Sequence, residues 1–292
     1  MIGIIVKALS GFYYVEVDGV IYECRARGSF RKSGISPLVG DMVQIEKVSD
    51  SEGVINGILP RKNAVKRPPV ANIDKLFIVS SYTNPPPNCL LIDKMTVAAR
   101  FNNIEPIIVF NKCDMGDFSQ WREIYVKSGF KTFVVSARDN TGTECIMREL
   151  ADCISAFTGN TGVGKSSILS RLLNKEIATG EVSQKLGRGR HTTRHTELYK
   201  TANNGFVADT PGFSSFELDM QNYDLKEKLA DCFPDFDAFV SDCRFVGCTH
   251  TKEAGCAVIR AVKNGKIQVT RHQSYMQMVQ DMKDLKPWKV KK

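Results

Sequence analysis

The chain has 292 residues, of which 42% are hydrophobic, and a formal net charge of +8. This length is sufficient for two or three domains with buried cores. No apolar run is long enough to span a membrane, and Met1–Leu9 is not a convincing signal peptide. Without a secretion signal, the nine cysteines favour reduced thiols and a metal site over a disulfide framework. We therefore predict a cytoplasmic protein that has no membrane partner.

The positive charge is concentrated near the carboxyl end. From Arg260 onward the sequence contains nine lysines and arginines but only two acidic residues, Asp281 and Asp284, which is a local balance of +7. Such a segment can bind nucleic acid, or it can be only a solvated end of the chain. Composition alone leaves both interpretations open.

Residues 1–68 have the pattern of a small β-domain. Phe12–Val17, the turn Asp18-Gly19 and Val20–Arg27 together predict a hairpin. Further strands are expected at Val43–Glu46 and Gly53–Leu59. About five short strands in this length predict an all-β barrel of the OB type, whose open face commonly binds oligonucleotides.

Basic residues accompany the predicted barrel. Arg25, Arg27, Arg31 and Lys32 cluster around one of its loops, which suits RNA binding, although a barrel used only for packing has the same composition. The stretch from Arg61 to Pro69 is expected to be a linker to the next domain.

Strands and helices alternate after Asp74. This alternation predicts a parallel sheet with helical crossovers in an α/β domain at residues 69–222. The expected strands are 76–80, 106–110, 132–135 and 153–157, and the expected helices are 89–102, 119–128, 143–151 and 165–173. Residues 223–292 are predicted to form a third, mainly helical domain that contains several cysteines and ends in the basic tail.

A phosphate-binding loop lies between the last of these strands and its helix. Gly159–Ser166 matches G-x-x-x-x-G-K-[ST] at every fixed position. The glycines let backbone N–H groups face the phosphates, Lys165 reaches the β- and γ-phosphates as a catalytic residue, and the Ser166 hydroxyl binds Mg²⁺. The predicted nucleotide-binding residues here are Gly159, Asn160, Thr161, Gly162, Val163, Gly164, Lys165, Ser166 and Ser167.

A guanine-reading motif precedes this loop in the chain. Asn111-Lys112-Cys113-Asp114 has the N-K-x-D form, follows an apolar strand, and is followed one helix and one strand later by Ser136-Ala137. The Asp114 carboxylate can accept two hydrogen bonds from guanine, and adenine lacks that pair of donors. Asn111, Lys112, Asp114, Ser136 and Ala137 are therefore predicted to bind the base of GTP or GDP.

The order of the motifs is rearranged relative to ordinary GTPases, in which the phosphate loop comes first and N-K-x-D last. Here N-K-x-D comes first, the phosphate loop second, and Asp209-Thr210-Pro211-Gly212 last. A site assembled in space does not depend on motif order, and the termini of a compact domain often lie close together. The sequence thus predicts a circularly permuted P-loop GTPase.

The segment between the phosphate loop and Asp209 is predicted to contain a switch loop, Gly187–Arg194. Asp209 is expected to hold Mg²⁺ through water, the Gly212 N–H to face the γ-phosphate, and Thr193, with Thr192 as the alternative, to bind the metal. Phe213 stands where many GTPases have a glutamine that orients water. We therefore predict that His191 is catalytic together with Lys165 and Thr193. The alternative for His191 is that it only contacts phosphate or RNA.

Cys243, Cys248, His250 and Cys256 form a Cys-x4-Cys-x-His-x5-Cys cluster. Three thiolates and one imidazole within 14 residues are typical of a closed, tetrahedral structural zinc site, so one Zn²⁺ per chain is expected. The alternative is three buried thiols and a surface histidine. The remaining six cysteines are scattered and are expected to act as small hydrophobic residues.

Together these motifs resemble the ribosome small subunit-dependent GTPase A family over essentially the full length. The resemblance rests on Asn111–Asp114, Gly159–Ser167, Gly187–Thr193, Asp209–Phe213 and the cysteine spacing. It implies an OB-fold amino-terminal domain at residues 1–68, a central permuted GTPase domain at 69–222, and a zinc domain at 223–292. The chain departs from the family pattern where Ala151–Thr158 enters the phosphate loop with almost no connecting turn.

The resemblance further implies a partner and an activity. A GTPase of this family acts in late maturation of the small, 30S ribosomal subunit, contacts its 16S rRNA, and hydrolyses GTP faster when bound to it. We expect a monomer. Two alternatives are a zinc-dependent RNA-binding module with a vestigial nucleotide pocket, and a GTPase that acts on another RNA.

Overall fold

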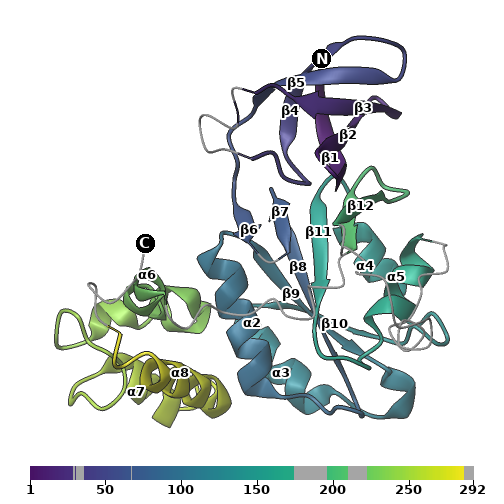
Figure 1. Ribbon diagram of the computed structural model, residues 1–292. Coiled ribbons are helices and arrows are strands. Elements are labelled where there is room, and N and C mark those ends of the chain that lie inside the picture. Colours follow the sequence, from purple (N-terminus) through teal and green to yellow (C-terminus); the bar gives the residue numbers. More distant parts are fainter. Residues whose placement is uncertain (29, 31–35, 67, 174–195, 210–221, 286–292) are drawn as a thin grey trace, which may run out of the picture.

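The computed structural model describes residues 1–28, 30, 36–66, 68–173, 196–209 and 222–285. In this part of the chain, eleven strands join into one sheet with the order β10-β9-β8-β11-β13-β12-β1-β2-β3-β5-β4, and β6 and β7 form a separate pair. Figure 1 shows the barrel at one end, the α/β domain in the middle and the carboxyl-terminal helices at the side. None of the described helices is long and apolar enough to cross a membrane.

The amino-terminal barrel has the predicted all-β fold. It consists of β1 (Ile2–Leu9), β2 (Phe12–Val17), β3 (Val20–Ala26), β4 (Met42–Lys47) and β5 (Glu52–Ile58), and a pairing of β1 with β4 closes it. The predicted hairpin turn is present, with Asp18 and Gly19 both at positive φ (50° and 86°), as a type I′ turn requires. The strand β1 was not among the strands expected from the sequence.

The connection after the barrel is more ordered than the expected linker. Two short strands, β6 (Ala64–Lys66) and β7 (Pro69–Ala71), pair antiparallel within it. Arg61 binds both carboxylate oxygens of the buried Asp41, each at 2.7 Å, and Asn72 donates to the carbonyl of Gly40. The prolines at 68 and 69 suggested a linker, because proline has no N–H to donate to a sheet. Pro69 is nevertheless the first residue of an edge strand, a position at which no ladder hydrogen bond from its N–H is needed.

The α/β domain is a parallel sheet with one antiparallel strand. The strands β8 (Lys75–Ser81), β9 (Glu105–Asn111), β10 (Lys131–Val135), β11 (Ile154–Thr158) and β13 (Phe206–Asp209) run parallel, and β12 (Glu197–Lys200) pairs antiparallel to β13. The tight entry to the phosphate loop is a turn at residues 151–153 in which Asp152 has φ 51°.

Alternate residues of the strands serve two separate cores. On one face, Leu76 and Ile78 pack with α2 (Cys89–Phe101) and α3 (Ser119–Lys127). On the other face, Phe77 and Val79 pack with α4 (Thr143–Glu149) and α5 (Lys165–Leu173). This arrangement exposes the carboxyl ends of the strands at one edge, where such sheets bind ligands.

The barrel and the α/β domain share a strand boundary. The second half of β1 pairs antiparallel with β12, in a register that places Lys7 opposite Glu197. Two ion pairs accompany this junction, between Lys7 and Glu197 at 3.2 Å and between Lys200 and Glu16 at 2.6 Å. The barrel is thus an extension of the central sheet.

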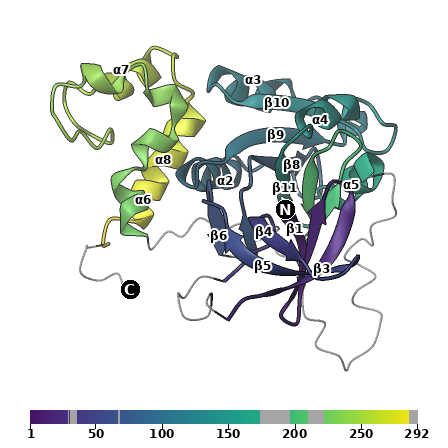
Figure 2. The same ribbon diagram turned by 90° about the horizontal axis from the view of Figure 1, so that it is seen from above.

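The carboxyl-terminal region is mainly helical, as predicted. It contains α6 (Tyr223–Glu227), three short 3₁₀ turns, α7 (Ala257–Lys263) and α8 (Val269–Asp281), which share a core of their own. Val97 of α2 is buried in that core, while other residues of α2 pack beneath the sheet. Figure 2 shows α2 between the sheet and α8, so this helix joins the two domains.

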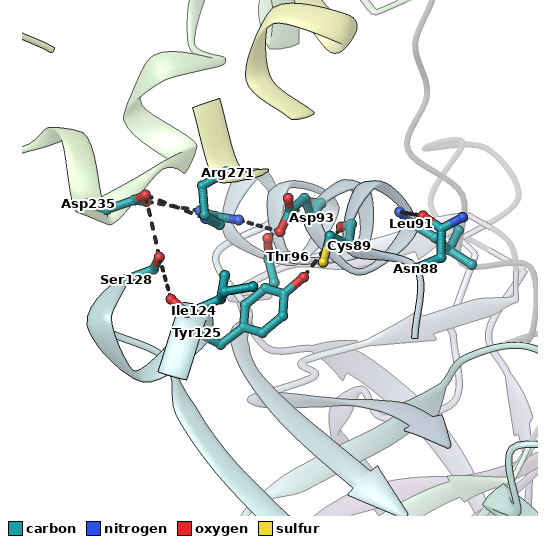
Figure 3. Close-up of polar contacts among 10 residues, drawn as sticks. All are labelled: Asn88, Cys89, Leu91, Asp93, Thr96, Ile124, Tyr125, Ser128, Asp235 and Arg271. Carbon is teal, nitrogen blue, oxygen red and sulfur yellow. Dashed lines mark hydrogen bonds and ion pairs between the residues drawn. The ribbon is translucent and has the colours of Figure 1, made fainter. Parts of the chain in front are cut away.

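A buried ionic cluster ties α8 to α2 (Figure 3). Arg271 of α8 binds Asp93 of α2 at 2.6 Å and Asp235 at 3.0 Å, and Arg271 and Asp93 have no exposed side-chain area. The guanidinium also lies 4.5 Å from the ring centroid of Phe233. Burial alone would lower the pKa of Arg271, but the two carboxylates more than offset this and raise the pKa, so the group stays charged.

Candidate nucleotide and metal sites

The phosphate loop joins β11 to α5 at the predicted edge of the sheet. Gly159 has φ 137°, and a Cβ there would lie 2.1 Å from the carbonyl oxygen of Val79. Gly164 has φ 93°, and a Cβ there would lie 2.2 Å from the side-chain nitrogen of Asn111. Both positions therefore require glycine, because φ is positive and a Cβ would clash. A loop with this backbone conformation can turn successive N–H groups toward a phosphate.

The Lys165 ammonium lies over this loop. It donates hydrogen bonds of 2.7 Å to the carbonyl oxygens of Gly159 and Asn160. Burial lowers its pKa, which indicates a cation in a poorly solvated position. A poorly solvated cation is strongly stabilised by an anionic phosphate, because the phosphate oxygens replace the water that burial removes from it.

Asn111 braces the two predicted halves of the site. The side chain is buried, donates to the Val163 carbonyl of the phosphate loop at 2.9 Å, and accepts from the Ala137 N–H at 3.1 Å. The ammonium of Lys112 donates to the Gly162 carbonyl at 2.8 Å. The structure thus brings the N-K-x-D motif, Ser136-Ala137 and the phosphate loop together, although they are distant in the sequence.

The Asp114 carboxylate, which is predicted to read the base, lines a pocket of the structure. One oxygen accepts a 2.9 Å hydrogen bond from the Ser136 hydroxyl, and the other lies 3.7 Å from the guanidinium of Arg138. Its remaining acceptor capacity can serve the N1–H and the exocyclic amine of guanine. A matched hydrogen-bonding group of this kind discriminates strongly against a base without the donors.

A pocket of about 590 Å³ opens beside Asp114 and extends to α5. This volume is within the range of small-molecule sites. It is lined by Asn111, Lys112, Asp114, Met115, Ser136, Ala137, Arg138, Gly164, Ser167, Ser170 and Arg171.

Two arginines of this pocket were not anticipated from the sequence. Arg138 directly follows Ser136-Ala137, a position that could have been noticed. Arg171 donates to the carbonyl oxygens of Ala137 and Arg138 at 3.2 and 3.3 Å. It thereby holds residues 136–138, which follow β10 and are called here the base-reading loop after their predicted role, against α5. Its role depends on tertiary contacts that no local motif indicates.

Several predicted residues lie outside the described part of the chain. These are His191, Thr192, Thr193, Gly212 and Phe213, with the rest of the predicted switch loop. Asp209 ends β13, and its backbone is paired opposite Glu197. The predicted metal-binding residue therefore lies at the carboxyl end of a strand of the central sheet, a strand that was not among those expected from the sequence.

The four predicted zinc ligands converge in the carboxyl-terminal domain. The donor atoms of Cys243, Cys248, His250 and Cys256 all lie within 4.8 Å of one another. The His250 Nδ1 is 3.6 Å from the Cys243 sulfur and 3.5 Å from the Cys256 sulfur, and these two sulfurs are 3.9 Å apart. A tetrahedral zinc with its usual bond lengths separates its ligand atoms by about 3.5–3.8 Å, which is close to the three separations among Cys243, His250 and Cys256. The chemistry of the four donors suits that ion.

Residues of α8 hold this ligand loop in place. The Tyr275 hydroxyl donates to the Thr249 carbonyl at 2.9 Å, and the His272 Nε2 lies 2.8 Å from the His250 carbonyl oxygen. The Glu253 carboxylate accepts from the N–H groups of Thr249 and Thr251. Burial lowers the pKa of His250 and favours the neutral imidazole that a metal binds.

The permuted motif order, the glycine-rich loop and the base pocket define a nucleotide-binding protein of the circularly permuted GTPase class. The model of the RsgA GTPase family matches residues 58–219, and that of the RsgA N-terminal domain matches residues 2–55. The chain belongs to the RsgA GTPase family, and it is a GTP hydrolase by this membership.

Named relatives match nearly the whole chain. A protein of Caldanaerobacter subterraneus subsp. tengcongensis named "Small ribosomal subunit biogenesis GTPase RsgA" is 44% identical over 286 residues, which are 97% of this chain and 96% of the relative. A relative of the same name from Alkaliphilus metalliredigens is 42% identical, over 96% of this chain and 97% of the relative.

Solved structures support the same fold. YloQ, described as a circularly permuted GTPase, superimposes with a TM-score of 0.83 at 35% identity, over 98% of this chain and 96% of that chain. YjeQ from Thermotoga maritima gives a TM-score of 0.81 at 31% identity, over 98% of this chain and 99% of that one. The predicted combination of barrel, permuted GTPase domain and zinc-type domain is confirmed.

Proposed function

We propose that this GTPase acts in biogenesis of the small ribosomal subunit, binding the 30S subunit through its 16S rRNA and hydrolysing GTP faster when bound. Binding of a guanine nucleotide is supported most directly by the two hydrogen bonds of the Asn111 side chain, which join the phosphate loop to the base-reading loop. The names of the relatives support the ribosomal part. The protein would work as a cytoplasmic monomer with domains at residues 1–68, 69–222 and 223–292.

Each site residue has a distinct role in this proposal. Asp114 selects guanine, Lys112 packs along the base, and Ser136-Ala137 complete the base pocket. Residues Gly159–Ser167 bind the phosphates, and Lys165 stabilises negative charge on the β- and γ-phosphates during transfer to water. Ser166, Asp209 and Thr193 are the residues that would hold Mg²⁺, an ion that neutralises phosphate charge when bound.

The switch residues are proposed to make hydrolysis depend on the ribosome. Phe213 cannot orient a water molecule, so the free protein should hydrolyse GTP slowly. Docking on the 30S subunit would order Gly187–Thr193 and place His191 beside the attacking water. Supplying a catalytic group in this way is worth a factor of 10³–10⁵ in other GTPases, so stimulation of roughly tenfold or more is expected here.

The central experiment measures GTP hydrolysis with and without purified 30S subunits. Stimulation of roughly tenfold or more supports the proposal, and equal rates would contradict it. The variant His191→Ala should abolish stimulation while leaving nucleotide affinity and 30S binding nearly unchanged. If it instead loses 30S binding and keeps its free turnover, His191 is a docking residue and the catalytic assignment is wrong.

Base selection is tested separately with Asp114→Asn. Loss of this paired carboxylate should weaken GDP binding by about 2–4 kcal/mol and erode the preference over ADP. Isothermal titration of GDP and ADP measures both effects. Equal affinity of the unaltered protein for the two nucleotides would exclude guanine selection. Failure to bind either nucleotide would favour the RNA-binding module with a vestigial pocket.

A further inference from the structure

The loop between the first two metal ligands carries an exposed aromatic side chain. Phe245 is 50% exposed and its neighbour Val246 is fully exposed. Among the phenylalanines, tyrosines and tryptophans that the structure describes, Phe245 has the most exposed side chain, and the others are buried or half-buried. Single exposed apolar side chains are common on protein surfaces. Phe245 differs from such a residue in the anchoring of its loop and in the cations near it.

The backbone of this tip is restrained on both sides. The Arg244 N–H donates to the Gly255 carbonyl at 3.2 Å, and the Arg244 stem packs so closely on Gly255 that a Cβ at Gly255 would lie 3.0 Å from the Arg244 Cβ. Cys243 and Cys248, which flank the tip, belong to the convergent donor set. Phe245 is thus presented on a short, anchored loop, which reduces the entropy lost when it binds a partner.

The charges around the tip select the type of partner. From Asp242 to Gln268 the exposed cations are Arg244, Lys252, Arg260, Lys263 and Lys266. The acidic residues of the same segment are Glu253 and the exposed Asp242, and the Glu253 carboxylate is engaged by backbone N–H groups. The guanidinium of Arg244 lies 5.4 Å from the centroid of the Phe245 ring. This excess of positive charge favours a polyanion over an apolar groove of another protein.

We propose that the Arg244–Gly247 tip docks on RNA, with the Phe245 ring stacked on an unpaired base and Arg244 beside the adjacent phosphate. Single-stranded RNA is recognised by stacking of bases on aromatic side chains and arginine planes, and stacking requires an accessible ring of this kind. The inference rests on the proposed 30S function, because it identifies the type of contact that the carboxyl-terminal domain would make with that partner.

Site-specific photocrosslinking identifies what the tip touches. Benzoylphenylalanine at position 246 in the full-length protein, bound to 30S subunits with a non-hydrolysable GTP analogue, should crosslink to a discrete nucleotide of 16S rRNA. The same probe at Val126, an exposed valine on α3, serves as the control and should not give that crosslink. A crosslink only to a ribosomal protein, or no crosslink from position 246, would overturn the proposal.

Substitution measures the contribution of the ring. Phe245→Ala should weaken 30S binding about tenfold, Phe245→Trp should retain it, and Val126→Ala should leave it unchanged. Arg244→Gln should lower the slope of log affinity against log salt by about one. Zinc content and GDP affinity, measured in each variant, should stay at the unaltered values and so exclude a folding defect.

The outcomes separate the two proposals. If the unaltered protein does not bind 30S subunits, both the proposed function and this inference are wrong. If it binds them and Phe245→Ala binds equally well, the function stands and the stacking contact is wrong.

Discussion

The barrel and the carboxyl-terminal domain flank the same GTPase domain, but they are attached by different kinds of interaction. The barrel is attached through backbone pairing of β1 with β12 and a proline-containing hairpin. The carboxyl-terminal domain is attached through side chains, with Arg271 between Asp93 and Asp235 in a buried cluster. Backbone pairing tolerates most substitutions, whereas a buried ionic cluster depends on each of its members.

The largest effect is expected from removing the metal of the carboxyl-terminal domain. Binding of structural zinc contributes folding free energy directly, so chelation or Cys248→Ala should unfold residues 222–285 and leave the barrel and GDP binding largely intact. Hydrogen exchange, compared between the barrel and the carboxyl-terminal domain, measures which of them unfolds. Metal analysis before chelation should find close to one zinc per chain.

A matched control for that change is Cys232→Ala. Cys232 is buried in the same domain but is not one of the four converging residues, and burial raises its pKa to about 11. The variant should keep its zinc. A metal-free protein whose carboxyl-terminal domain remained folded would contradict the zinc assignment.

Loss of the ionic cluster should be the next largest effect. Arg271→Met leaves Asp93 and Asp235 without their cation in a buried position, and such a change costs about 3–5 kcal/mol. We expect the carboxyl-terminal domain to become sensitive to limited proteolysis while the barrel stays protected.

Lys94→Met provides the comparison, because Lys94 pairs with Asp281 between the same two helices but both side chains are about 30% exposed. That pair should contribute about 0–1 kcal/mol. Equal proteolysis rates for the two variants would show that the buried cluster does not hold the domains together.

The barrel side of the comparison can be tested at Gly40. This residue has φ 89°, and a Cβ there would lie 2.2 Å from the Ala71 carbonyl oxygen in the hairpin that joins the domains. Gly40→Ala should therefore destabilise the barrel by about 2–3 kcal/mol, from backbone strain and the steric clash together.

Gly19→Ala isolates the strain alone, since Gly19 has φ 86° with nothing within 4 Å of an added Cβ. It should cost about 1 kcal/mol. The difference between the urea denaturation midpoints of the two variants measures the free-energy cost of the contact between a Cβ at position 40 and the Ala71 carbonyl. Equal midpoints would show that the backbone at Gly40 relaxes freely.

The smallest effect is expected at the strand junction itself. Glu197→Gln removes the Lys7 ion pair, in which both side chains are about one-third exposed. The backbone pairing remains, so the change in unfolding free energy should be below about 1 kcal/mol and should shrink further with added salt. A loss of several kcal/mol would mean that side chains, and not the ladder, carry this junction.

Much of the fold was predictable because its signals are local. The Asp18-Gly19 turn fixed one hairpin, and the apolar strands before Asn111 and Gly159 placed both nucleotide motifs at one sheet edge. The helix Lys165–Leu173 was predicted with its observed bounds. The strand β1 was not predicted, although the β-branched residues of Ile2–Leu9 are a strand signal.

The features that escaped prediction depend on tertiary contacts. Nothing local to Arg271 or Asp93 indicates that residues 178 positions apart form an ion pair. Arg171 supports the base-reading loop only because α5 packs beside it. By contrast, the four predicted zinc ligands lie within 14 residues, so their spacing was sufficient to predict that they converge.

One edge of β1 is shared between two ladders, while the other edge pairs with β2, and this has a consequence for solubility. Its first half pairs with β4 and its second half with β12, so β12 is not left as an open edge of the central sheet. The opposite edge, β10, is five residues long and begins at Lys131. Open edges recruit strands from other molecules, and short length and lysine discourage this. The barrel therefore protects the GTPase sheet from edge-to-edge aggregation, a role that is independent of any RNA it binds.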